Sequence, residues 1–462
     1  MRLGAVDASG RSGVLSSCRD PRHAERKATT HLGDAAVERS TTTMFEAEFA
    51  IFAAIVFVFA LVSHRVERLN VTAPMAFIAA GMLFGASHLF NVSINNGALL
   101  LIGSIALVLV LFTDASRINI SLFRVNAELP ARLLIIGLPL TIAVGAVFAA
   151  LLFTNLTIWQ AAIIGAVLAP TDAGLGQAIV TSERVPVRIR EALNVESGLN
   201  DGGSVPFLLV FLALAAIQEG VEPPSFWTVA VEQIGIGVAI GLFIGIAGGW
   251  LIRSATRRGW MSRTFKRLSF LALAILAWGV AGPIGGSGFI AAFVGGFATG
   301  ATVGDVEEAA TDFSEAEGEL LLLAVFFLVG VVATSLVGSL DWTIVLYAIL
   351  SLTVIRMLPV AISLVGTKLR RSSVLFLGWF GPRGLASIVL VLVALEEPAL
   401  AALAPQIATI VLVTVIFSVF AHGISAQPGA SLYARRVAAM DSDAPELRDV
   451  SLLPARTRRT GK

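Results

Sequence analysis

Thirteen long apolar runs follow one another along this 462-residue sequence. A bilayer core is about 30 Å thick, so a helix needs about 20 apolar residues to cross it. The runs are rich in Leu, Ala, Ile and Val and do not alternate with polar residues, which favours spanning helices over barrel strands. They lie at 46–63, 73–90, 97–113, 130–153, 158–180, 190–216, 227–252, 267–282, 287–302, 319–337, 341–366, 373–395 and 402–424.

The composition excludes most other classes of protein. Hydrophobic residues make up 56% of the chain and charged residues 14%, against about 25% charged in soluble domains. The only cysteine, Cys18, rules out an internal disulfide framework. The net charge of +1, without a sustained basic face, argues against nucleic acid as a partner. No nucleotide-binding or catalytic-triad motif occurs, so we expect no enzyme and no cofactor. The sequence predicts an all-α polytopic membrane protein with about thirteen transmembrane helices.

Lys and Arg residues predict the topology, because cytoplasmic loops retain them. They occur in the linkers after runs 1, 3, 5, 7 and 11 and in the tail after run 13. The linkers after runs 2, 4, 6, 8, 10 and 12 contain none. We therefore expect a multi-pass protein of the cell (inner) membrane, with its N-terminus outside and its C-terminus in the cytoplasm. The acidic linker at 303–319 is the exception, but acids contribute little to orientation.

The two ends of the chain are expected to lie outside the membrane domain, which covers residues 44–426. Residues 1–43 contain seven Lys or Arg residues and no apolar run. They are either a disordered tail or the product of a mis-assigned start, with Met44 as the initiator. Residues 427–462 are polar and are expected to form a disordered cytoplasmic tail.

Two of the apolar runs contain helix-breaking residues near their centres. Run 5 includes the sequence GAVLAPTDAGLGQAIV, and run 12 includes FLGWFGPRGLASIVLV. Proline removes a backbone hydrogen bond, and glycine makes an unwound stretch accessible. The runs are seven spans apart, so the two broken helices have opposite directions, and spans 4–6 and 11–13 form inverted triplets. Paired interrupted helices in inverted repeats are typical of a transporter's midplane site.

Few charged residues lie within the membrane, and each is costly unless it is partnered or functional. Within run 6, Ser197 and Asp201 are i,i+4 neighbours, so a hydroxyl and a carboxylate can face one small cation. We expect Glu196 to pair with a positively charged side chain. The alternative is that Glu196 contacts the transported ion directly. The intramembrane charges are Asp172, Glu196, Asp201, Arg356 and Arg383, with Asp114 at the cytoplasmic end of run 3.

Arg356 is the natural partner for Glu196, because Arg383 lies in the broken stretch of run 12. We expect this buried pair to fix the helices rather than to bind the ion. Asp201 is then the principal candidate for ion binding. Asp114 is either part of the ion pathway or an interfacial acid at a helix end.

The segments PTDAG, ESGLNDG and GPRG, in that order, make the chain resemble the monovalent cation:proton antiporter family. The resemblance is to its sodium/proton exchanger branch with an Asn-Asp pair in span 6, and it covers about residues 44–426. It implies an ion site formed by the Thr171 backbone carbonyl, Asp172, Ser197 and Asp201. It also implies that Asn200 orients Asp172 and that Glu196 pairs with Arg356.

The resemblance further implies a homodimer with an elevator-like core, residues 127–216 and 341–424, and scaffold helices at 44–126 and 220–337. The chain departs from the family at Ala173, where a proline is usual.

The function expected from these features is the exchange of Na⁺ or K⁺ for H⁺. Asp201 would hold either a proton or the metal ion, and Asn200 cannot release a proton, so we expect electroneutral exchange. An organic-anion transporter of similar inverted-repeat fold and a cation channel are the alternatives. An anion site would show a surplus of cations near the breaks, whereas acids dominate here. The sequence leaves Na⁺, K⁺ and Li⁺ equally open.

Overall fold

The computed structural model of the chain describes residues 48–66, 69–87, 90, 97–118, 127–172, 174–220, 230–304, 308–441 and 443–448. The chain divides into two units, Met1–Ala60 and Leu61–Lys462. The first apolar helix, Glu48–Val66, contains the point of division, and every other helix described below belongs to the second unit. Residues 1–43, including Cys18, lie outside the described residues.

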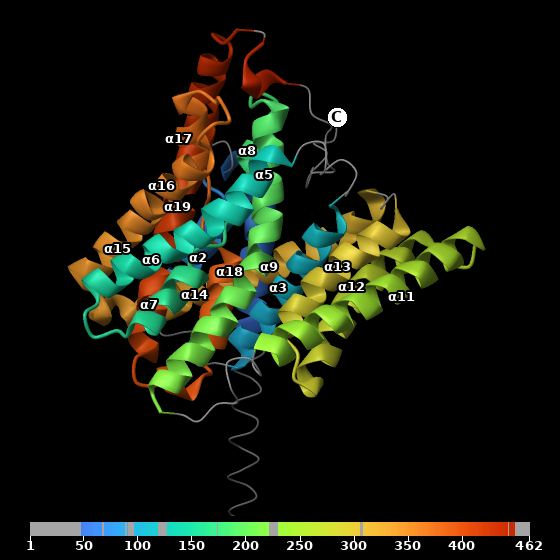
Figure 1. The fold of residues 1–462 in the computed structure, drawn as a ribbon, viewed down its shortest axis with the longest axis horizontal. Helices are drawn as coiled ribbons and strands as arrows, with labels where there is room; N and C mark the ends of the chain where they lie inside the picture. The colour runs from blue at the N-terminus through green and yellow to red at the C-terminus, as the bar shows by residue number, and fades with distance from the viewer. Residues whose placement is uncertain are drawn as a thin grey trace, which may run out of the picture. The chain divides into compact units, whose positions relative to one another are not determined.

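All regular secondary structure among the described residues of the second unit is helical (Figure 1). Its α-helices are α2 (Ala73–Ala86), α3 (Gly97–Ser116), α5 (Glu128–Arg132), α6 (Leu138–Leu152), α7 (Ile158–Val167), α8 (Gln177–Val180), α9 (Val187–Gln218), α11 (Gly237–Arg257), α12 (Arg263–Ala281), α13 (Gly288–Val303), α14 (Glu308–Leu336), α15 (Trp342–Leu352), α16 (Val354–Ser363), α17 (Arg371–Trp379), α18 (Leu385–Ala394) and α19 (Ala404–Val437). Two π-helical segments, η1 (Leu133–Gly137) and η2 (Ala230–Ile236), precede α6 and α11. A short 3₁₀ helix, η6 (Pro445–Leu447), follows α19.

The predicted membrane fold is confirmed. Among the described residues, nine helices are long and apolar enough to cross a bilayer, and four shorter apolar helices accompany them. Each of the thirteen apolar runs corresponds to one of these helices, and runs 5 and 12 are interrupted as expected. Run 11 is also interrupted, which the sequence did not predict. Its two parts, α15 and α16, meet at Thr353, whose φ of −109° and ψ of −94° are not helical.

The contacts between helices of the second unit define two groups, and Figure 1 shows α11, α12 and α13 of the first group side by side. In one group α11, α12 and α13 pack together and against α3, while α2 packs along α14. In the other, α6 packs on α7 and α16, α15 packs on α19, and α7 packs on α9. Close approach of α2 and α14 depends on small residues, as in many membrane helix pairs. A Cβ on Gly330 would collide with the Ile78 carbonyl, and a Cβ on Gly81 with the Phe327 carbonyl.

The acidic segment 303–319 is not the linker that the sequence predicted. Residues 305–307 lie outside the described residues, but α14 begins at Glu308 and includes the rest of the segment. Ala and Glu, which are strong helix formers, are frequent here, and acids are favourable near a helix N-terminus. From Glu308 onward, the acidic residues therefore form the first turns of a helix that continues as span 10.

The prediction of a disordered tail from residue 427 is wrong for its first part. Helix α19 continues through Pro428 to Val437, and η6 packs back on the protein. The Glu446 side chain is fully buried, and its Oε1 accepts hydrogen bonds from the Arg370 backbone N at 2.7 Å and the Ser373 hydroxyl at 2.8 Å. Arg370 is the N-cap residue of α17, so the tail carboxylate satisfies backbone and side-chain donors at that helix N-terminus.

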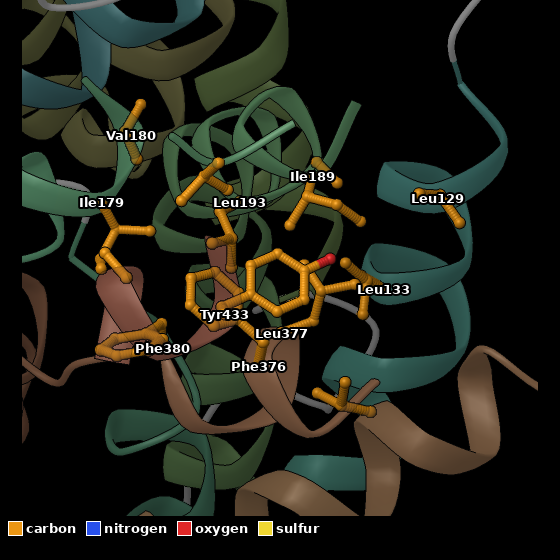
Figure 2. Packing of buried hydrophobic residues seen from close by; sticks show 14 of the residues in the cluster. Leu129, Leu133, Ile179, Val180, Ile189, Leu193, Phe376, Leu377, Phe380 and Tyr433 are labelled. Atoms are coloured by element: carbon orange, nitrogen blue, oxygen red, sulfur yellow. The ribbon is translucent and has the colours of Figure 1, made fainter. Parts of the chain in front are cut away.

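A buried apolar cluster supports this docking (Figure 2). It includes Tyr433 of α19, which stacks on Phe376 of α17 with ring centroids 4.2 Å apart. The Tyr433 hydroxyl also donates to Ser373 at 2.9 Å. Leu129 and Ile189 bring α5 and α9 into the same cluster. These contacts explain why the chain beyond the last apolar run remains ordered through at least η6.

Candidate ion-binding site

The two interrupted spans meet inside the second unit. The first break is the non-helical stretch between α7 and α8, and the second lies between α17 and α18. The Asp172 backbone N donates to the Pro382 carbonyl at 2.7 Å, so unwound backbone of one break bonds unwound backbone of the other. Such bonds satisfy groups that have no water to bind at this depth. The sequence prediction that runs 5 and 12 form one paired site therefore has direct support.

Asp172 stabilises both breaks through its side chain. Its Oδ1 accepts from the Gly174 N at 2.8 Å, which fixes its own turn. Its Oδ2 accepts a hydrogen bond, at 3.1 Å, from the backbone N of Leu385, which is the first residue of α18. A carboxylate is favourable at a helix N-terminus, where the macrodipole is positive. The approach requires glycine at position 384, because a Cβ there would overlap the Asp172 carboxylate.

Arg383 provides the reciprocal contact from the second break to the first. Its side chain is fully buried, and its guanidinium donates to the Ala169 carbonyl and, at 3.1 Å, to the Pro170 carbonyl. These carbonyls follow the C-terminal end of α7, where the helix dipole is negative. Each break therefore supplies the charge that complements the helix end of the other: Asp172 at the start of α18 and Arg383 beyond the end of α7.

A buried histidine in α19, which the sequence reasoning missed, belongs to a hydrogen-bonded group that holds the backbone of the second break. The Arg383 backbone N donates to the Ser418 hydroxyl at 2.6 Å. The Ser418 hydroxyl lies 3.1 Å from His422 Nδ1, and His422 Nε2 lies 2.8 Å from the Trp379 carbonyl. His422 Nδ1 also lies 2.9 Å from the Ser418 carbonyl, so the Ser418 hydroxyl and carbonyl both face Nδ1, while Nε2–H can donate to the Trp379 carbonyl. Ser418 and His422 are an i,i+4 polar pair in an apolar run, and that spacing was the available signal.

On α9, Ser197 and Asn200 lie against the first break. The Thr171 and Ser197 hydroxyl oxygens are 2.9 Å apart. Asn200 Nδ2 donates to the Thr171 hydroxyl at 2.7 Å, and Asn200 Oδ1 accepts from the Thr171 N at 3.2 Å. The expectation that Asn200 orients Asp172 is therefore wrong in this structure. Both ends of the amide hold Thr171, because its N–H and hydroxyl face α9 while the Asp172 carboxylate faces α18.

Asp201 follows Asn200 directly and lies one helical turn from Ser197, as the spacing predicted. The residue is buried, with 7% of its surface exposed. The same part of α9 contacts the other helix group at two glycines. A Cβ on Gly198 would stand 3.4 Å from Asp114 Cβ of α3, and a Cβ on Gly202 would overlap the Phe293 ring of α13. Asp114 thus lies beside the α9 segment that carries Ser197 and Asp201.

The predicted pair of Glu196 and Arg356 is present and bidentate. Arg356 Nη1 lies 2.6 Å from Glu196 Oε1, and Arg356 Nη2 donates to Oε2 at 2.8 Å. The two side chains are 2% and 3% exposed. Gly381 of the second break leaves the space for Arg356, since a Cβ there would stand 2.5 Å from its Nε. The pair therefore joins α9 to α16 directly beside the interrupted part of span 12.

The site combines hydroxyl and carboxylate oxygens, which suit hard cations. Thr171, Ser197 and Asn200 form one hydrogen-bonded group beside Asp201, while the Asp172 carboxylate caps α18 instead. Within the described ranges, no three His, Cys, Asp or Glu side chains gather closely enough to hold a metal ion. The donor set is thus rich in neutral oxygens and differs from a multi-carboxylate divalent-metal site.

A protein-family model described as "Sodium/hydrogen exchanger, transmembrane" matches residues 53–431, which is most of the chain. The chain belongs to the sodium/hydrogen exchanger family. This is a family of multi-pass membrane transporters, not of enzymes. The family resemblance carried by PTDAG, ESGLNDG and GPRG is therefore confirmed.

Curated relatives agree with this assignment, and a solved structure shares the fold. The chain is 28% identical over 344 residues to the "K(+)/H(+) antiporter NhaP" of Alkalimonas amylolytica, covering 73% of this chain and 59% of the relative. It is 25% identical over 254 residues to the "K(+)/H(+) antiporter NhaP2" of Shewanella sp. strain ANA-3, covering 54% and 43%. The chain thus spans about half the length of the curated relatives it matches. The sodium proton antiporter MjNhaP1 from Methanocaldococcus jannaschii shares its fold, with a TM-score of 0.70, 18% identity, and coverage of 86% of this chain and 100% of that one.

Proposed function

We propose that this member of the exchanger family is a secondary antiporter that exchanges Na⁺ or K⁺ for H⁺. The observation that carries the proposal is the placement of Asp201, a buried carboxylate on α9 within one turn of Ser197 and next to the Asn200–Thr171 bonds. A carboxylate in this position can be neutralised by either a proton or a monovalent cation. The relatives described as K⁺/H⁺ antiporters support the same conclusion.

In this mechanism Asp201 supplies the charge, and neutral oxygens supply the remaining ligands. Ser197 and the Thr171 backbone carbonyl lie on the two segments that the Thr171–Ser197 contact brings together. The Asp172 oxygens already accept the Gly174 and Leu385 N–H groups, and Oδ2 keeps a second lone pair that can bind an ion without breaking either bond. The main role of Asp172 is therefore to hold the two breaks together, and ion binding is its secondary role.

The stoichiometry follows from the groups that can gain or lose charge. Asn200 releases no proton, and Glu196 is neutralised by Arg356. One carboxylate that alternates between H⁺ and a monovalent ion gives one-for-one, electroneutral exchange. The core moves only when Asp201 is neutral, because an uncompensated buried charge is costly to move through a bilayer.

The arrangement of the whole protein is part of the proposal. Residues 127–216 and 341–424 form the moving core, and residues 44–126 and 220–337 form the scaffold of a homodimer. The core ranges contain both breaks and their bracing contacts, and α9 meets the scaffold at Gly198 and Gly202. The Lys and Arg distribution supports an external N-terminus and a cytoplasmic C-terminus in the cell membrane.

The experiment is cation-induced dequenching of a pH-sensitive dye in everted vesicles, with Na⁺ or K⁺ as the chloride salt. Wild-type protein should collapse the proton gradient, and Asp201→Asn should not, although it inserts and folds. Glu397→Gln, which changes an exposed acid in the turn after α18, is the matched control and should stay active. Full activity of folded Asp201→Asn would refute the assignment of this residue. Dequenching that requires an organic anion, or that follows the membrane potential without cation coupling, would favour the anion transporter or the channel.

A further inference from the structure

An open groove lies between α11 and α12, near the loop that joins them. It has a volume of about 410 Å³, within the range of about 300–1,000 Å³ common for ligand pockets. Its lining is mostly apolar and includes Trp250, Leu251, Leu273, Leu276, Trp260 and Arg258. A Cβ on Gly248 would stand 2.5 Å from Leu273, so this glycine allows the two helices to approach at the groove.

The apolar lining is accessible from the outer surface of the second unit. Trp250 is 59% exposed, Leu251 is 58% exposed and Leu276 is 50% exposed. In a membrane protein such side chains face hydrocarbon, so an acyl chain is the natural occupant of the groove's inner part. The apolar surface alone does not select one lipid over another, but the charges at the loop end do.

That end of the groove is strongly basic. No Asp or Glu occurs between residues 233 and 304. Trp260 lines the groove, and the Arg258 guanidinium lies 4.8 Å from its ring centroid. Tryptophan is enriched at membrane interfaces, and basic pockets between spanning helices bind anionic lipid headgroups. The basic residues around the loop are Arg253, Arg257, Arg258, Arg263, Lys266 and Arg267.

We propose that this groove binds an anionic phospholipid, with an acyl chain along Leu251 and Leu276 and the phosphate at Arg258. A second copy of the chain is a poorer occupant, because a symmetric contact would place the same six cations against each other. A phospholipid without net charge would add no negative charge to this basic loop, whereas an anionic one would. The Lys and Arg distribution assigns this loop to the cytoplasmic side, so the ligand belongs to the inner leaflet.

The test is native mass spectrometry of the purified full chain, titrated with phosphatidylglycerol or phosphatidylcholine of identical acyl chains. Phosphatidylglycerol should bind more tightly. Arg258→Gln should weaken its binding about fivefold, the contribution of one basic residue near an anionic headgroup. Arg436→Gln, which removes an exposed arginine near the end of α19, is the matched control and should retain wild-type binding. Ala272→Trp should block the groove without changing its charge.

Three results would overturn the proposal. The first is equal binding of the two lipids, and the second is equal loss in Arg258→Gln and Arg436→Gln. The third is a change in oligomeric state of Arg258→Gln with unchanged lipid binding, which would assign the groove to a second copy of the chain. Binding is measured without transport, so failure here would leave the proposed antiport untouched, and loss of antiport would leave this test valid.

Discussion

The buried pair of Glu196 and Arg356 offers the sharpest test of how the core is held together. The two side chains make contacts of 2.6 and 2.8 Å and are 2% and 3% exposed, so neither has water to replace its partner. Glu196→Gln or Arg356→Ala leaves the other charge buried and uncompensated, at a cost of about 3–5 kcal/mol. The loss should appear as reduced folded yield and a lower midpoint of thermal unfolding.

The double change Glu196→Gln with Arg356→Ala should recover part of that loss, because no charge remains buried alone. Unfolding of all three variants in one detergent gives the coupling energy of a double-mutant cycle. The exposed pair of Arg370 and Asp441, at 3.0 Å, is the matched control. Its side chains are 47% and 80% exposed, and Asp441→Asn should cost only about 0.2–1 kcal/mol. Single changes as mild as the control, or costs that simply add, would refute the reasoning.

Three further changes test the braces around the site. Gly384→Ala places a methyl group on the Asp172 carboxylate and should lower both exchange rate and thermal stability, whereas Gly338→Ala, which has open space, should change neither. Asn200→Ala removes both bonds to the first break and should cost about 1–3 kcal/mol for each buried group left unsatisfied, measured by thermal unfolding. Glu446→Ala should destabilise the N-terminal end of α17 and speed hydrogen exchange there, and unchanged protection would show that the tail does not cap it.

Much of the fold could be predicted because apolar length and helix breakers act locally. A run such as 97–113 has few alternatives to a spanning helix, and α3 occupies Gly97–Ser116. Pro170 and Pro382 with their neighbouring glycines predicted the two breaks. The Glu196–Arg356 pair followed from counting charges, because a buried acid needs a partner and few cations were available.

The individual contacts of the site could not be predicted, because they depend on which backbone groups the fold brings within reach. Asn200 can bond either Thr171 or Asp172 from the same helix position, and only the packing of α9 on the first break selects Thr171. The Asp172 carboxylate accepts a hydrogen bond from the backbone N of Leu385, 213 residues away in sequence. The burial of Glu446 was equally hidden, since its donors lie at the start of α17.

In the proposed mechanism one carboxylate, that of Asp201, holds either the proton or the cation. The most direct measurement is the initial rate of exchange in proteoliposomes as a function of Na⁺ or K⁺ concentration at a series of pH values. If the proton and the cation compete for Asp201, a higher proton concentration should raise the apparent KM for the cation and leave the maximal rate nearly unchanged. The proposed mechanism also predicts rates that do not change when valinomycin clamps the membrane potential in Na⁺-driven exchange. A single shared site would be contradicted by a maximal rate that falls as the pH is lowered while the KM stays constant. A rate that follows the clamped potential would also contradict it.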